Sequence, residues 1–208
     1  MCPAAADTGQ VQERARRDHE LELWLAAARR NDQAGFTGLY RCLAGRVAGY
    51  LRGRGVTDPD DVTNEVFLGA FGKLGGFDGG AADFRSWLFA IASNKASDWH
   101  RRRARRPQVQ DASESVLSTL GGGDVEAESM ELLGRSAVGD MLDHLTPDQR
   151  DVLLLRIVAE LTLEETAQAL GKPVGAVKAL QHRAIAALRR NLGEAVSPEA
   201  GPTITGVR

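Results

Sequence analysis

The chain is organised around residues 161–190, which run LTLEETAQALGKPVGAVKALQHRAIAALRR. Thr162 and Glu165 form a capping-box pair, in which each side chain accepts a hydrogen bond from the other residue's backbone N–H. Apolar residues then recur at helical spacing as far as Gly171. Gly171 can take the left-handed conformation that ends a helix, and Pro173 cannot continue one. We therefore predict a short helix that begins after Thr162.

A second helix should follow, because Val177, Leu180, Ala184 and Leu188 share one helical face. Ala167 is small enough to let the two helices approach. Two short helices joined by a tight turn are typical of a helix-turn-helix, whose second helix lies in the major groove. Away from its apolar face this helix carries Lys178, His182, Arg183, Arg189 and Arg190. The alternative is a helical hairpin whose charges are merely solvated.

Composition limits the class of protein. The chain has 208 residues, of which 43% are hydrophobic, so it can build a core. Cys2 and Cys42 are too few for a disulfide framework, and the histidines lack metal-ligand spacing, so we expect no metal and no cofactor. We expect Cys42 to be a small hydrophobic residue beside the core. No apolar run approaches the ~18 residues needed to span a bilayer, which predicts a cytoplasmic protein without membrane insertion.

Charge is distributed unevenly along the chain. The formal net charge is only −2, which by itself argues against a nucleic-acid-binding protein. However, residues 95–106 are strongly basic, whereas residues 107–134 contain acidic residues and no Lys or Arg. A nearly neutral total therefore conceals a basic surface next to an acidic segment.

Helical periodicity dominates the N-terminal half, and no strand pattern is visible. We predict helices over residues 20–30, over 36–51 with Asp32 as the cap, from Asp58-Pro59 onward, and over 84–105 with Asp83 as the cap. A glycine-rich loop occupies residues 75–80. Thr146-Pro147 marks another helix start.

The predicted fold class is all-α, with two small helical domains joined by a flexible acidic linker, the C-terminal domain being a helix-turn-helix. The predicted segments are a flexible N-terminal extension (1–18), a helical domain (19–106), the linker (107–131), the helix-turn-helix domain (132–192) and a flexible tail (193–208).

Residues 84–106 combine cations, amides and aromatic rings on one predicted helix. Cations of this kind hold phosphates, and aromatic faces stack on unpaired bases. Trp87 shares an apolar stripe with Leu88 and Ile91, so we interpret it as a core residue. For Trp99 both a core role and a stacking role remain open, and the Arg run alone could be a solvated helix end.

These motifs resemble a known family. The segments DVTNEVF at residues 61–67 and FRSWLFAIA at 84–92 are similar to the first domain of bacterial extracytoplasmic-function (ECF, group 4) sigma factors. LTPDQR at residues 145–150 and the helix-turn-helix are similar to their second domain. The resemblance covers residues 20–192, and it implies a protein that gives core RNA polymerase its promoter specificity.

The resemblance implies that the helix starting at Asp61 docks on the clamp helices of the largest polymerase subunit. Its carboxylates would face a basic partner, and Phe67 would be an exposed aromatic anchor although it lies at the edge of the apolar stripe. In the alternative interpretation Asp61 only caps the helix, and Asn64 stands where the family usually has Gln. The expected polymerase-binding residues are Asp61, Asn64, Glu65, Phe67 and Phe71.

For the minus-ten element, the resemblance implies that the glycine-rich loop captures a flipped base and that the following helix lies along the non-template strand. Extruding a base costs a few kcal/mol, which phosphate neutralisation and stacking together can offset. In the alternative interpretation Asp98 pairs with Arg101 or Arg102 one turn on. The expected contacts are Phe77, Asp78, Asn94, Lys95, Asp98, Trp99, Arg101 and Arg102.

For the minus-thirty-five element, the expected contacts are Lys178, Gln181, His182 and Arg183, of which Gln181 suits an adenine edge. The implied partners are core RNA polymerase, promoter DNA and an anti-sigma protein. No phosphate loop or nucleophile–base pair indicates an enzyme. The competing hypotheses are a regulator that binds duplex DNA unaided and a protein-interaction module that does not bind DNA.

Overall fold

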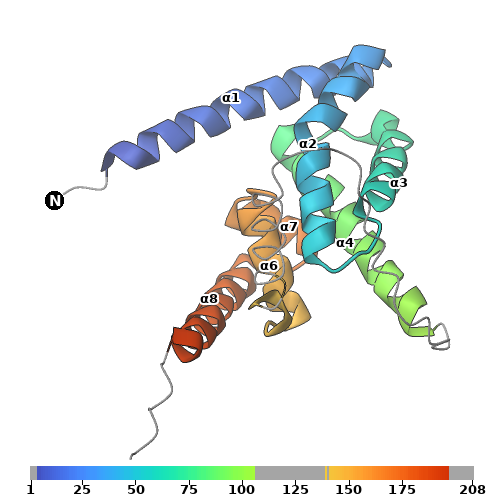
Figure 1. The fold of residues 1–208 in the computed structure, drawn as a ribbon. Helices are drawn as coiled ribbons and strands as arrows, with labels where there is room; N and C mark the ends of the chain where they lie inside the picture. Colours follow the sequence, from blue (N-terminus) through green and yellow to red (C-terminus); the bar gives the residue numbers. More distant parts are fainter. Residues whose placement is uncertain (1–3, 106–138, 140, 197–208) are drawn as a thin grey trace, which may run out of the picture.

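The structure, a computed structural model, describes residues 4–105, 139 and 141–196. All regular elements within these ranges are helices, which confirms the predicted fold class (Figure 1). The expected linker, residues 107–131, lies outside the described residues. The elements are α1 (Ala4–Arg29), α2 (Gln33–Gly53), α3 (Pro59–Phe71), the 3-10 turn η1 (Leu74–Gly76), α4 (Ala81–Arg105), α6 (Pro147–Ile157), α7 (Leu163–Leu170) and α8 (Val174–Val196).

The N-terminal unit is a bundle of α2, α3, α4 and the C-terminal half of α1. Its core is formed by the apolar stripes that the sequence pattern marks, and residues such as Leu25, Leu39 and Phe84 are fully buried. Asp32 caps α2 as predicted, because its side chain accepts a hydrogen bond from the backbone N–H of Ala34. Burying these stripes supplies the main stabilisation of the bundle.

The start of the chain differs from the prediction. Residues 1–18 were expected to be a flexible extension and the first helix to begin near residue 20, but α1 begins at Ala4 and continues to Arg29. Arg14, Arg17 and Asp18 make ion pairs with distant parts of the chain. The sequence pattern misses the first part of this helix because charged rather than apolar contacts hold it there.

Two helix starts also differ in detail. Asp58 precedes α3, and Pro59 takes the first helical position, but the Asp58 side chain makes no capping hydrogen bond. Helix α4 begins at Ala81, three residues before the predicted start. Asp83 still serves this terminus, since its carboxylate accepts a hydrogen bond from the backbone N–H of Gly80.

The C-terminal unit comprises α6, α7 and α8. Both α6 and α7 begin with complete capping boxes, Thr146 with Gln149 and Thr162 with Glu165. Gly171 has a φ of 61°, the left-handed conformation that the sequence predicts at the end of α7. Helix α8 runs to Val196 and so extends into the predicted tail of residues 193–208.

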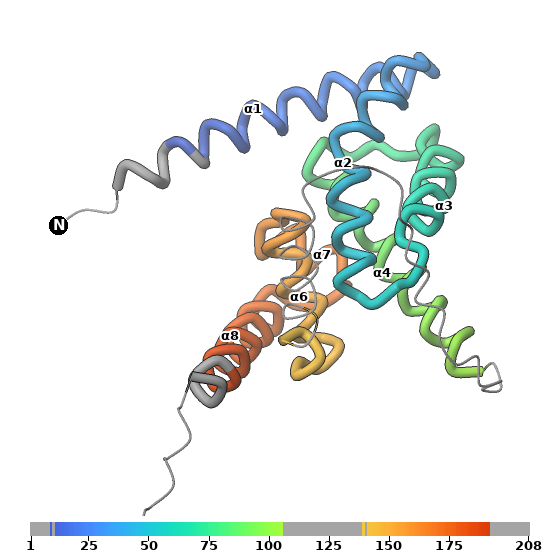
Figure 2. Tube along the Cα trace, viewed as in Figure 1, coloured from blue at the N-terminus to red at the C-terminus, as the bar shows by residue number. Residues whose placement is uncertain are grey.

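The two units are packed together rather than separated (Figure 2). The largest apolar core includes residues of α2 and α4 together with Leu154, Leu155, Leu161 and Ala169 of the C-terminal unit. Helix α7 lies against α4, and α6 lies against α2. The core is therefore continuous across the two halves, which periodicity within a segment cannot predict.

Candidate nucleic-acid interface

The helix-turn-helix presents one face of α8 to solvent. Ala167, Val152 and Val177 form a small buried cluster that fixes the angle between α7 and α8. The polar face is open: Lys178, His182 and Arg183 are exposed, and Gln181 is half-buried. The cationic side chains of the second helix therefore share a solvent-facing side of α8.

A second exposed cationic segment is the C-terminal half of α4, which projects away from the bundle in a different direction from α8 (Figure 1). Arg101 and Arg102 are exposed there, and Asn94 is exposed about two turns earlier. Together with Lys95 these residues line a helix long enough to follow a phosphate backbone, since a helix rises about 1.5 Å per residue.

Trp99 is half-buried on this projecting helix. The Arg103 guanidinium carbon lies 5.4 Å from the centre of the Trp99 ring, and the His100 ring meets it edge-on at 5.0 Å. Trp99 also packs against the main core. Trp99 therefore contributes to the core and keeps some solvent exposure, so a stacking role stays a prediction.

Asp98 forms an ion pair with Arg101, as the alternative interpretation of the sequence predicts. The hydrogen bond from Arg101 lowers the pKa of the Asp98 carboxyl, and Arg101, Arg102 and Lys95 add favourable charge interactions. Asp98 therefore stays ionised and orients Arg101.

The loop between η1 and α4 is anchored rather than free. Phe77 is half-buried and stacks on Trp87, with ring centres 5.0 Å apart and an interplanar angle of 15°. Arg29 donates hydrogen bonds to the carbonyl oxygens of Phe77 and Gly79. Trp87 packs against the core, as predicted. Asp78 is exposed, whereas the carbonyl oxygens of Phe77 and Gly79 are occupied by Arg29.

The exposed face of α3 differs from the prediction at one residue. Asp61, Asn64 and Glu65 are exposed, as expected. Phe67, however, is only 2% exposed and belongs to the core, so it cannot be a surface anchor. The neighbouring Leu68 is 72% exposed.

Helical spacing explains this correction. Residues 61, 64, 65 and 68 follow the i, i+3, i+4, i+7 pattern of a single helix face. Phe67 instead lies on the buried stripe and packs against Tyr40 and against Phe71, which is half-buried. The helical spacing of residues 61, 64, 65 and 68 is visible in the sequence and predicts an exposed Leu68. The expectation of Phe67 followed instead from the frequency of aromatic residues at interfaces.

The α3 face and the α4 arm are linked by an ion pair. Lys95 Nζ lies 2.6 Å from a Glu65 carboxylate oxygen. Asn64 is also engaged, because its Oδ1 accepts a hydrogen bond of 3.0 Å from the Tyr40 hydroxyl. Residues expected at two different interfaces, polymerase and DNA, are thus adjacent on one surface of the bundle.

Other chemistry is sparse in the described part of the chain. No group of three or more His, Cys, Asp or Glu residues there is arranged to hold a metal ion. Cys42 is half-buried beside the core, and burial, together with the negative charge of Glu20, raises the pKa of its thiol. None of the described helices is long and apolar enough to cross a membrane.

Comparison with known proteins agrees with this arrangement. Residues 33–106 match the family "Sigma-70 region 2", and residues 141–190 match "Sigma-70, region 4". The chain is 32% identical over 132 residues to the ECF RNA polymerase sigma factor ShbA of Streptomyces griseus, covering 62% of this chain and 69% of ShbA. It is 34% identical over 148 residues to the ECF RNA polymerase sigma factor BldN of Streptomyces coelicolor, covering 69% of this chain and 54% of BldN.

A solved structure is also similar. The structure of CnrH in complex with the cytosolic domain of CnrY matches with a TM-score of 0.65 and 28% identity, over 87% of this chain and 99% of that chain. This chain belongs to the ECF RNA polymerase sigma factors. The matching segments span 54% of BldN and 61% of SigD of Mycobacterium tuberculosis.

Proposed function

We propose that this chain, as a group 4 sigma factor, binds core RNA polymerase and directs it to promoters. The observation that carries the proposal is the order of the two family matches in one chain, region 2 before region 4, each with an exposed polar face. On this proposal the chain performs no chemical step itself and works in the cytoplasm, where polymerase and chromosome are.

In the proposal, α8 recognises the minus-thirty-five element. Lys178, His182 and Arg183 are exposed on a helix whose opposite face is buried, so their side chains are free to meet base edges and phosphates. Gln181 is half-buried and adds a donor–acceptor pair suited to adenine. Each good base contact of this kind contributes about 1–3 kcal/mol of discrimination.

The minus-ten element is assigned to the α4 arm and the loop before it. Lys95, Arg101 and Arg102 would neutralise phosphates, and Trp99 would stack on an unpaired base while Asp98 holds Arg101 in place. In the loop, the exposed Asp78 would contact the flipped base, while the Phe77 ring anchors the loop by stacking on Trp87. Asn94 is exposed beside this path.

Polymerase docking is assigned to the exposed face of α3. Asp61, Asn64 and Glu65 would face basic groups of the clamp helices, and Leu68 replaces Phe67 as the apolar contact. A large exposed apolar side chain surrounded by carboxylates has the composition of an interface anchor with a polar rim.

A protein that covers this chain and holds it inactive is a further part of the proposal. It is supported by the likeness to CnrH, whose structure was solved in complex with the cytosolic domain of CnrY. We propose an anti-sigma protein as the corresponding partner.

Recovery of genomic DNA fragments by the chain with and without core polymerase tests the proposal. We expect discrete promoter fragments to be enriched only when both proteins are present. The double variant Lys178→Ala/Arg183→Ala should lose most of this enrichment and keep its affinity for core polymerase. Loss of polymerase binding in that variant would show that the recognition helix is wrongly assigned.

The same experiment separates the competing function. If the chain alone enriched the same fragments as tightly as the mixture, it would be a regulator that binds duplex DNA unaided. The proposal would then fail, because a sigma factor gains its promoter specificity within the polymerase complex.

A further inference from the structure

The two halves fit together closely where α6 meets α2. Gly49 and Gly53 lie on the contacting face of α2, and a Cβ atom built at Gly49 would lie 2.8 Å from Val158 Cγ1. A Cβ at Gly53 would overlap the side chain of Leu154. Real Cβ atoms do not approach other atoms so closely, so the α2 surface lacks side chains where α6 packs. Gly45, one turn earlier on the same face, has no neighbour within 4 Å.

A buried polar cluster lies beside this contact. Tyr50 on α2 donates a hydrogen bond of 2.8 Å to Asp151 on α6. Arg54, just after α2, forms an ion pair with the same carboxylate. All three residues are buried. Burial, reinforced by the negative charge of Asp151, raises the pKa of Tyr50, which therefore remains a hydrogen-bond donor.

A second charged cluster joins α1 and α4 to α7. Arg85 on α4 lies 2.5 Å from one carboxylate oxygen of Glu165, and Arg14 on α1 lies 2.7 Å from the other. Asp18 on α1 pairs with Arg85 from the opposite side. The Glu165 side chain also completes the capping box of α7 with the N-cap residue Thr162, so the N-terminal unit contacts the helix-turn-helix at the first turn of α7.

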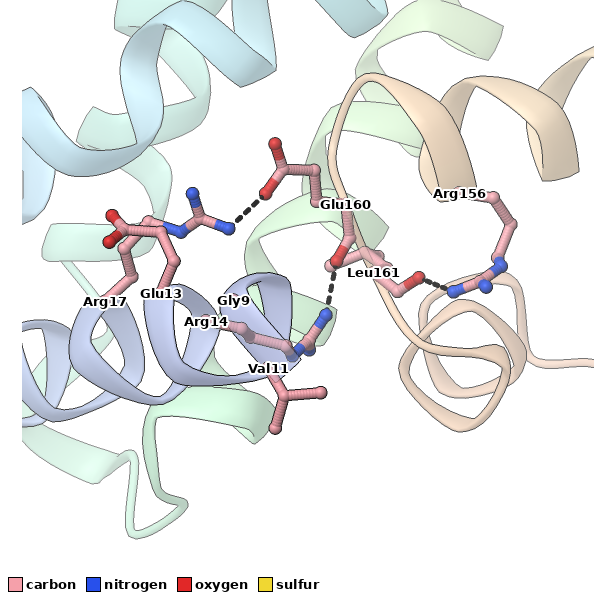
Figure 3. A pocket seen from close by; sticks show the side chains of 8 residues that line it. All are labelled: Gly9, Val11, Glu13, Arg14, Arg17, Arg156, Glu160 and Leu161. Atoms are coloured by element: carbon pink, nitrogen blue, oxygen red, sulfur yellow. Dashed lines mark hydrogen bonds and ion pairs between the residues drawn. The ribbon is translucent and has the colours of Figure 1, made fainter. Parts of the chain in front are cut away.

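The third contact is the turn between α6 and α7 (Figure 3). Glu160 has a φ of 56°, a conformation that non-glycine residues rarely adopt. Its carboxylate accepts from Arg17 at 2.8 Å and from Arg46 at 3.0 Å, and its carbonyl oxygen accepts from Arg14 at 2.7 Å. Arginines of the N-terminal unit thus surround a turn that adopts this uncommon geometry.

This closed arrangement conflicts with promoter binding. The two promoter elements are roughly 25 base pairs apart by their names, or roughly 85 Å of DNA at 3.4 Å per base pair. Trp99 lies about 21 Å along α4 from Arg85, at 1.5 Å per residue. Because Arg85 contacts Glu165, and Lys178 follows Glu165 by one short helix and one turn, the two DNA-facing surfaces lie too close together to reach both elements.

We propose that the free chain inhibits itself by this closed contact, with the N-terminal arm of α1 as a latch. This inference rests on the proposed sigma function. Arg14 and Arg17 fasten the arm to Glu160 and Glu165, so promoter binding requires the arm to release and α7 to leave α4. The exposed α3 face stays accessible in the closed state, so polymerase can engage the chain first and then compete with the latch.

The charged part of the contact is suited to opening. Desolvation of a buried ion pair offsets much of its Coulomb attraction, so such pairs specify a geometry more than they stabilise it. After opening, each arginine and carboxylate regains water. For a partner that binds only the open chain, the apparent dissociation constant is the intrinsic constant divided by the fraction of open chains. A variant that opens the chain therefore binds such a partner more tightly.

The test uses a wedge at the α2–α6 contact in the full chain. Gly49→Ala/Gly53→Ala introduces two methyl groups that overlap the side chains of Val158 and Leu154 in the closed state, so these side chains must move, while alanine favours helix α2. Gly45→Ala is the matched control. We expect the double variant to have a larger radius of gyration by solution X-ray scattering. It should also need about tenfold less chain for half-maximal promoter transcription with core polymerase.

A second variant, Arg14→Gln/Arg17→Gln, opens the latch without touching the α2–α6 contact and should shift both readouts in the same direction. The inference fails if both variants scatter like the wild type, or if they expand without any gain in transcription. Scattering concerns the free chain alone, so it tests the closed contact even if the wild type supports no transcription. A wild-type chain that supports no transcription with core polymerase would refute the proposed sigma function, not the closed contact.

Discussion

At the scale of single residues, Phe67 and Leu68 show how one position along a helix separates a core residue from a surface residue. Phe67 is buried among the rings of Tyr40 and Phe71, whereas Leu68 is exposed beside Glu65. An aromatic side chain is an attractive interface anchor by composition. Position on the helix determines which of the two side chains is exposed, because only the helix face that carries Asp61 and Glu65 is accessible to solvent.

We expect Phe67→Ala and Leu68→Ala to have opposite effects. Phe67→Ala leaves a cavity and should cost about 3–5 kcal/mol of unfolding free energy. Leu68→Ala should change stability by less than about 0.5 kcal/mol and weaken binding to core polymerase by about 1–2 kcal/mol. Urea unfolding and equilibrium binding to polymerase measure the two quantities. Unchanged polymerase affinity in Leu68→Ala would remove α3 as the docking helix.

Glu165 should make stability depend on pH. Burial raises the pKa of its carboxyl, but hydrogen bonds from Arg85, the Thr162 backbone N–H and Arg14 outweigh burial, so the pKa is lowered overall. Since the unfolded value is about 4.3, the contribution of Glu165 is fully present above that pH. It is lost as the pH falls through the lower, folded value.

The expected outcome is that Glu165→Gln is less stable than the wild type at pH 7 and that the difference shrinks below about pH 4. Urea unfolding at a series of pH values measures it. Glu164→Gln is the matched control, because Glu164 is the exposed neighbour of Glu165. A constant difference across the acid range would mean that the ionised carboxylate is not the stabilising species.

At the scale of elements, helix ends follow local chemistry where a side chain can reach the backbone. The capping boxes before α6 and α7 are complete, and the left-handed Gly171 ends α7. Helix α7 has only 8 residues, and a helix of this length is marginal without its caps. Its orientation, and so that of α8, depends on both ends.

Thr162→Ala should therefore destabilise the chain by about 1 kcal/mol through loss of the cap. Gly171→Ala should cost a similar amount, about 1 kcal/mol, because alanine disfavours a positive φ. In both variants, the backbone amide hydrogens of α7 should exchange faster than those of α4. Gln168→Ala, at an exposed position within α7, provides the comparison and should be nearly neutral. Equal protection of α7 in all three variants would contradict this account of its ends.

The sequence predicts those features of the fold that depend on neighbouring residues. Asp32, the two capping boxes and the helix-turn-helix faces all involve groups within about one turn of each other. The helical start of α1 escaped prediction because Arg14 and Arg17 pair with Glu165 and Glu160, which lie far away in sequence. Asp58 fits the pattern of a cap yet makes no capping bond. A residue type that favours capping does not determine whether its side chain turns toward the backbone N–H groups of the helix.

At the scale of the whole molecule, the continuous core makes the two family regions one structural unit in the free chain. Leu154, Leu155 and Leu161 are buried among residues of the N-terminal bundle. Neither half of the sequence alone indicates this contact, because each apolar face would also suit a core of its own. A division of the chain into two domains, based on periodicity, therefore separates residues that share one buried core.

The described helices should unfold together in one transition. A shared core couples the halves, and small coupled units unfold cooperatively. Scanning calorimetry of the wild type should show a single peak, whereas the Gly49→Ala/Gly53→Ala variant should show two partly separated peaks. Two separate peaks in the wild type would indicate that the halves are not coupled in solution.

The central claim is that this chain gives core RNA polymerase its choice of promoter, and transcription from genomic DNA tests it most directly. Purified core polymerase would be incubated with the DNA in the presence or absence of the chain, and the transcript 5′ ends would be mapped. We predict transcripts that begin at a small set of discrete positions only when the chain is added. Identical 5′ ends with and without the chain would contradict the account.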